Sequence, residues 1–110
     1  MRKTKILLLT LALALCTAAA QAAQRPAALD RGRDLFDCGR WSDARHEFLR
    51  ARQALTPEEL LLRQEVDFYL AACAVELGAA EAEASLREFE ERYPDSVFGN
   101  DVRVSLASFY

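Results

Sequence analysis

The sequence contains no apolar run long enough to cross a bilayer as a helix, which takes about 20 residues. Its longest run, Ile6–Leu15, has about half that length. Basic residues precede this run, and a stretch of small residues, Cys16–Ala23, follows it. This three-part layout predicts a secretory signal peptide over residues 1–22, with cleavage after Ala22 or the alanine that follows.

A lipid anchor at Cys16 is the alternative to simple cleavage. Leu13-Ala14-Leu15-Cys16 resembles a bacterial lipobox, in which the cysteine becomes lipid-modified. The residue before that cysteine is normally small, and Leu15 is not, so cleavage near Ala22 is favoured. Either route exports residues 23–110, to the periplasm or the outer membrane, and leaves no transmembrane helix in the mature chain.

Lysine is missing from the sequence after residue 22, and acidic residues dominate there. Removal of the leader leaves 11 arginines against 17 acidic residues, which is a net charge of −6. A chain this acidic lacks the basic surface that binds nucleic acid. Residues 23–57 hold seven arginines and five acids, whereas residues 58–110 hold four arginines and twelve acids. A basic partner would therefore be steered to the second half, although a solvated acidic face is the simpler reading.

The sequence has a single histidine and no arrangement typical of an active site. His46 lies between charged residues of helix-surface type, and no nucleophile or acid can be placed beside it from spacing. Glu88 and Glu91 share one helix face, but without an apolar cleft to raise one pKa they form a solvated surface. We therefore expect no enzyme activity and no cofactor.

Only two cysteines, Cys38 and Cys73, lie beyond the leader. In an oxidising compartment they could form a disulfide if their Cα atoms lie within about 7 Å. Cysteine also serves as a small, buried apolar residue, and that role is favoured. Further ligands at suitable spacing are missing, so no metal site is expected.

Helical periodicity runs through most of the sequence after residue 25. It predicts helices over 26–38, 42–55, 57–77 and 80–93, and a fifth from residue 96 onward. Gly39 and Gly78 are expected to end the first and third of these helices. Ser42 is expected to cap the second, and Thr56 with Glu59 predicts a capping box at the start of the third.

A pattern of apolar residues occurs twice in the chain. Ala44, Phe48, Ala51 and Leu55 precede Pro57, and Ala82, Leu86, Phe89 and Tyr93 precede Pro94. The two sets are offset by 38 positions (82 minus 44). A period in this range is typical of helix pairs that bury their apolar faces against a neighbouring pair. The sequence therefore predicts an all-α fold of antiparallel helix-hairpin repeats.

These residues resemble the tetratricopeptide repeat (TPR). In the first repeat Gly32, Leu35, Trp41, Ala44, Phe48, Ala51 and Pro57 fall at or next to signature positions of the family. In the second repeat Leu70, Cys73, Ala82, Leu86, Phe89 and Pro94 do so, and Leu106, Ala107 and Tyr110 would open a third. The segment Arg92-Tyr93-Pro94-Asp95-Ser96 is similar to bacterial envelope members, such as the lipoprotein of the β-barrel assembly machinery and the coordinator of the Tol–Pal system.

The resemblance implies a short right-handed α-solenoid with repeats at about 26–57 and 57–94 and a third that begins at about 96–110. It implies a scaffold for protein–protein or peptide binding along the first helix of each pair, as the N-terminal part of a longer array. The surface residues carried over are Arg33, Phe36, Asp37, Gln64, Asp67, Ala71 and Ala74. The helix that ends at Tyr110 would also allow self-association.

Two alternatives remain open at this point. A glycan-binding outer-membrane lipoprotein of a nutrient-uptake system would require lipidation at Cys16 and a long extension rich in Trp and Tyr. The repeats could instead form a non-catalytic appendage of an envelope enzyme.

Overall fold

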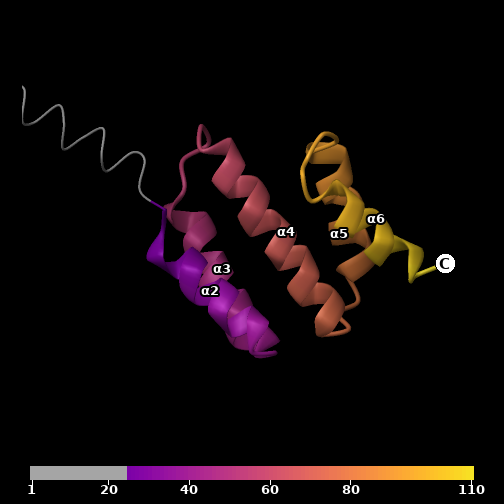
Figure 1. Cartoon of the computed structure of the whole chain (residues 1–110), viewed down its shortest axis with the longest axis horizontal. Coiled ribbons are helices and arrows are strands. Elements are labelled where there is room, and N and C mark those ends of the chain that lie inside the picture. Colours follow the sequence, from indigo (N-terminus) through magenta and orange to yellow (C-terminus); the bar gives the residue numbers. More distant parts are fainter. Residues whose placement is uncertain (1–24) are drawn as a thin grey trace, which may run out of the picture.

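A computed structural model describes residues 25–110, which form five α-helices (Figure 1). Their bounds are α2 (Ala27–Asp37), α3 (Trp41–Ala54), α4 (Leu60–Glu76), α5 (Ala82–Arg92) and α6 (Gly99–Ala107). Each helix packs mainly against the next one in the chain, which agrees with the all-α expectation. None of the helices in the described range is long and apolar enough to cross a membrane. The expected signal peptide, 1–22, and Cys16 lie outside the described residues.

The two predicted glycine stops are confirmed. Gly39 follows α2 with a φ of 78°, and Gly78 follows α4 with a φ of 63°. Left-handed backbone of this kind is easily adopted by glycine and lets the chain reverse onto the last turn of the helix. The amide of Arg40 then donates to the carbonyl of Leu35, and the amide of Ala79 donates to that of Ala74, both at 2.9 Å.

The predicted helix starts are less accurate. Helix α3 begins at Trp41, and the Ser42 side chain caps no helix end. Helix α4 begins at Leu60 rather than at 57. The Thr56 amide and hydroxyl both donate to the Glu59 carboxylate, at 3.2 and 3.0 Å. Because the hydroxyl donates to a side chain instead of accepting a backbone N–H, only half of the capping box forms, within a turn that precedes the helix.

The core consists of two clusters that meet at α4. The first contains Ala28, Leu29, Ala44, Phe48, Ala51, Leu55, Val66 and Cys73, and the second contains Ala71, Leu86, Phe89, Val102 and Leu106. Figure 1 shows the reason: α4 passes between the α2–α3 pair and the α5–α6 pair. The predicted apolar faces of α3 and α5 are thus confirmed as buried. Leu77, the last residue of the helix predicted over 57–77, is 41% exposed because it lies just past the end of α4.

Aromatic side chains connect these two clusters. Phe48 stacks on Tyr69 with a centroid distance of 5.0 Å, and Phe68 stacks on Phe98 at 4.4 Å. Phe68 and Tyr69 are adjacent in α4 and contact each other at 5.3 Å. Neighbours in a helix point about 100° apart, so each ring enters a different cluster while the two remain in contact.

Candidate functional site

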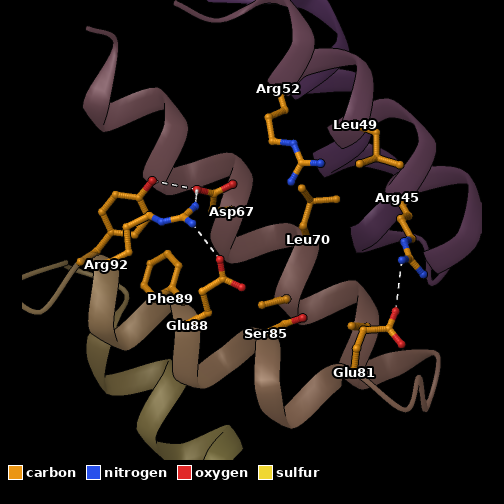
Figure 2. Close-up of a pocket in the computed structure, with 13 residues that line it drawn as sticks. Arg45, Leu49, Arg52, Asp67, Leu70, Glu81, Ser85, Glu88, Phe89 and Arg92 are labelled. Atoms are coloured by element: carbon orange, nitrogen blue, oxygen red, sulfur yellow. Dashed lines mark hydrogen bonds and ion pairs between the residues drawn. The ribbon is translucent and has the colours of Figure 1, made fainter. Parts of the chain in front are cut away.

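A hollow of about 190 Å³ lies between α3, α4 and α5 (Figure 2). Its floor is α4, through Asp67, Leu70, Ala71 and Ala74. One wall is the Arg45, Leu49 and Arg52 face of α3. The other is formed by α5, through Ser85, Glu88, Phe89 and Arg92, and by Glu81 and Tyr93, which flank that helix.

Helical spacing explains why these residues line one space. Arg45, Leu49 and Arg52 follow at steps of four and three, which places them on one side of α3. Glu81, Ser85 and Glu88 repeat the same steps on α5. Small residues face the middle of the space, namely Ser85 on the wall and the two alanines of the floor. Their side chains are too short to fill the gap between the two helix pairs, and a hollow remains.

Every carboxylate that lines this hollow has an internal partner. Glu81 forms an ion pair with Arg45 at 3.2 Å, which connects α5 to α3 across one end of the hollow. Arg92 pairs with Glu88 at 2.7 Å and with Asp67 at 3.6 Å. Asp67 also accepts a 2.7 Å hydrogen bond from the Tyr93 hydroxyl. Burial, followed by this hydrogen bond, raises the pKa of Tyr93 above its ordinary value.

Arg52 differs from these groups because it has no ion-pair partner among residues 25–110. The ion pairs and side-chain hydrogen bonds of the described chain do not include it. In Figure 2 its guanidinium extends from α3 into the hollow, over Leu70. Arg52 therefore offers unused hydrogen-bond donors and a positive charge to this space.

A second hollow, of about 620 Å³, adjoins the first. It lies between the start of α4 and the loop after α5, and the two hollows share Arg92 and Tyr93. Its other lining residues are Leu60, Arg63, Gln64, Pro94, Asp95 and Ser96. We call the two adjoining hollows the trough. It follows α4, whose 17 residues span about 25 Å at 1.5 Å per residue.

The structure divides the seven residues carried over from the family resemblance. Gln64, Asp67, Ala71 and Ala74 line the trough. Ala71 and Ala74 are each only 3% exposed, so the expectation that they point outward is wrong. They are buried because α5 packs over this side of α4.

The α2 members of that set, Arg33, Phe36 and Asp37, do not line the trough. Arg33 donates to Glu65 at 3.4 Å, and the Phe36 ring contacts Tyr69 at 5.3 Å. Each of these α4 residues is two positions from Asp67, or about 200° around the helix. The expected single surface is therefore divided between two opposite sides of α4. Asp37 is exposed at the end of α2.

Sequence reasoning missed the arginines of the trough. Arg45 and Arg52 look like ordinary surface residues, because they lie off the buried face of α3, and Arg63 lies in the first turns of α4. The available signal was the seven-residue spacing of Arg45 and Arg52, which places them on one side of α3 with Leu49 between them. Which neighbour they would meet could not be read from it.

Cys38 and Cys73, the cysteines of the described range, are not joined to each other. Cys38 is exposed just after α2, whereas Cys73 is fully buried in the first core cluster. Burial raises the pKa of the Cys73 thiol to about 11. Cys73 therefore has the apolar role that the sequence favoured. His46 is exposed on α3, and no group of three or more metal-ligating side chains comes together between residues 25 and 110.

Comparison with known proteins finds no protein family, no curated protein and no solved structure that matches this chain.

Proposed function

We propose that this chain is an exported, TPR-like helical scaffold of the bacterial envelope that binds a protein or peptide partner in the trough. The observation that carries the proposal is the trough itself. Three successive helices line it, and it includes charged groups, apolar side chains and two arginines without an ion-pair partner among residues 25–110. A long depression of mixed character is typical of a peptide-binding surface, whereas small-molecule sites are usually more enclosed and more apolar.

The buried repeat residues support the TPR-like part of the proposal. Ala44, Phe48 and Ala51 are each 0% exposed, and their counterparts 38 positions later, Ala82, Leu86 and Phe89, are 1–3% exposed. Equivalent positions therefore have equivalent burial in the two helix pairs. Further stacking in the same manner would build the short right-handed solenoid that the resemblance implies.

Export is tested with a reporter enzyme that becomes active only outside the cytoplasm. The reporter is fused after Tyr110, and the matched control lacks residues 1–22. We expect activity for the whole chain and none for the control. The mass of the recovered chain then distinguishes cleavage after Ala22 from a lipid-modified Cys16. Reporter activity that does not depend on residues 1–22 would contradict the export proposal.

Binding is tested by photo-crosslinking in living cells, with a photoreactive amino acid placed at Leu49 in the trough. We expect discrete adducts, identified by mass spectrometry. A second change, Ser85→Trp, should abolish them because the indole fills the hollow. Ala84→Trp is the matched control, since Ala84 is an exposed neighbour on α5 that does not line the trough. Adducts that survive Ser85→Trp, or that Ala84→Trp removes equally, would contradict binding in the trough.

A further inference from the structure

We infer that the occupant of the trough is an extended peptide whose acidic side chains pair with Arg52 and Arg63. This inference rests on the proposed function and specifies the chemistry of the partner. It runs against the net charge of the chain, which alone would favour a basic partner.

Most arginines of the described chain take part in ion pairs, and those that do not are unevenly placed. Among residues 25–110, the arginines that take part in ion pairs are Arg25, Arg31, Arg33, Arg40, Arg45, Arg50, Arg87 and Arg92. The three that remain are Arg52, Arg63 and Arg103. Two of these three line the trough. Donors without an internal partner are thus concentrated where a ligand would lie.

Most carboxylates of the trough pair with arginines of the trough itself. Asp67, Glu81 and Glu88 are all paired. Asp95, in the loop after α5, is the exception, since it lines the trough without an ion pair inside the described range. Arg45 and Arg92 engage these three carboxylates, so Arg52 and Arg63 are the guanidinium groups that the described range leaves for an acidic ligand, and Asp95 should weaken its binding.

Apolar side chains provide the other half of the recognition. Leu49, Leu70 and Phe89 line the first hollow, and Leu60, 61% exposed, lines the second. In an extended peptide alternate side chains point to opposite sides, so acidic residues can follow the arginines while apolar residues face the leucines.

The first hollow is closed at one end, where the Arg45–Glu81 ion pair connects its α3 and α5 walls. A helix with its side chains is about 10–12 Å across, and an extended strand is thinner, so an extended strand is the form of peptide that we assign to the trough.

The test is an NMR titration of the full chain with three 12-residue peptides. All are acetylated and amidated, so that neither terminus carries a charge. Glu, Gln or Lys occupies every second position, with Leu, Ala and Ser between. We expect the Glu peptide to bind at least about tenfold more tightly than the Gln peptide, and to shift the Nε–H signals of Arg52 and Arg63, because charge-assisted contacts are roughly twice as strong as neutral ones. The Lys peptide should not bind.

Charge reversal locates the contacts. Arg52→Glu and Arg63→Glu should each weaken binding of the Glu peptide at least about fivefold, and Asp95→Asn should strengthen it. Arg103→Glu is the matched control, because Arg103 is the unpaired arginine that does not line the trough. Arg103→Glu should change the affinity for the Glu peptide by no more than about twofold, since only long-range, screened charge interactions connect this position to the trough.

The outcomes separate this inference from the proposed function. If the Gln or Lys peptide binds as well as the Glu peptide and Ser85→Trp blocks it, the trough is a peptide site and only the acidic preference is overturned. Equal losses from Arg52→Glu and Arg103→Glu would also overturn the inference, as would binding by none of the three peptides. The proposed function is decided independently, by the crosslinks from position 49.

Discussion

The hydroxyl of Tyr93 donates a 2.7 Å hydrogen bond to the carboxylate of Asp67 and thereby attaches the end of α5 to the middle of α4. The Tyr93 ring packs against the second core cluster and lies 5.1 Å from that of Phe89. A polar contact and an apolar contact thus hold the same side chain. Because both hollows share Tyr93, this bond also fixes the shape of the trough where they meet.

Replacement of Tyr93 by Phe should lower the free energy of unfolding by about 1 kcal/mol at pH 7, the usual net value of one hydrogen bond. The effect should depend on pH. Because the folded pKa of Tyr93 is raised above 10, the bond contributes fully below pH 10 and is lost as pH rises through the folded pKa. Urea unfolding of the original chain and of Tyr93→Phe, measured from pH 7 to 11, should therefore show that the difference between their free energies of unfolding narrows above about pH 10.

Tyr110→Phe is the matched control for this series. Tyr110 is 77% exposed, and among residues 25–110 its hydroxyl makes no hydrogen bond. Its replacement should change the free energy of unfolding by less than about 0.5 kcal/mol at neutral pH. A Tyr93→Phe difference that stayed constant to pH 11 would show that the phenol ionises equally in both states.

The order of the five helices and the buried faces of α3 and α5 could be predicted from the sequence. The four-three-four spacing of Ala44, Phe48, Ala51 and Leu55 has only one helical interpretation, and Gly39 and Gly78 end helices by local backbone geometry alone. Both kinds of signal depend on residues close together in the chain. Little about the neighbouring helices is needed to interpret them.

The trough could not be predicted in the same way. Arg45 and Glu81 are 36 positions apart, and nothing local indicates that they meet. Helix α4 added to the difficulty because it is apolar on two sides. One side carries Val66 and Cys73 in the first cluster, and the other carries Ala71 and Phe68 in the second. Because α5 packs on the second of these sides, its position relative to α4 could not be predicted without recognising that side. The trough between the two helices could therefore not be predicted either.

Gly32 is required for the close contact between α2 and α3. A Cβ atom added there would lie 2.6 Å from Cε1 of Phe48, whose ring is fully buried. Gly32→Ala should therefore destabilise the fold by about 1–2 kcal/mol, since overpacking of about 1–3 kcal/mol exceeds the gain of up to about 1 kcal/mol in helix propensity. Urea unfolding measures the change.

Gly99→Ala is the control for this substitution. At Gly99 the nearest atom to an added Cβ belongs to the flexible Arg103 side chain, at 3.7 Å, so the free energy of unfolding should stay equal or rise. Equal losses at both glycines would indicate that a general effect of alanine, and not the Phe48 contact, is responsible.

The two cysteines should differ sharply in reactivity. Thiolates are the reactive form, and burial raises the pKa of Cys73 to about 11, whereas Cys38 is exposed. Iodoacetamide at pH 8 should modify Cys38 in the folded chain and leave Cys73 unmodified, and both should react in urea. Peptide mass mapping identifies the modified sites. If Cys38 reacted only after reduction, it would be held in a disulfide, and its expected free thiol would be contradicted.

Phe68→Ala tests whether α4 holds the two clusters together. The ring contacts Phe89 at 6.1 Å and Phe98 at 4.4 Å, so its loss removes aromatic contacts with α5 and with the segment that leads into α6. Truncation of a buried Phe lowers the free energy of unfolding by about 3–5 kcal/mol. Because the Phe68 ring is only half-buried, we expect a loss of about 3 kcal/mol or less. Hydrogen exchange should show faster opening in α5 and α6 than in α2 and α3.

The matched change is Phe36→Ala. It should accelerate hydrogen exchange more in α2 and α3 than in α5 and α6, because Phe36 packs on Trp41 and Tyr69 in the first half of the chain. Uniform acceleration in both variants would mean that the clusters unfold as one unit, and that α4 transmits the loss of either ring to the whole chain.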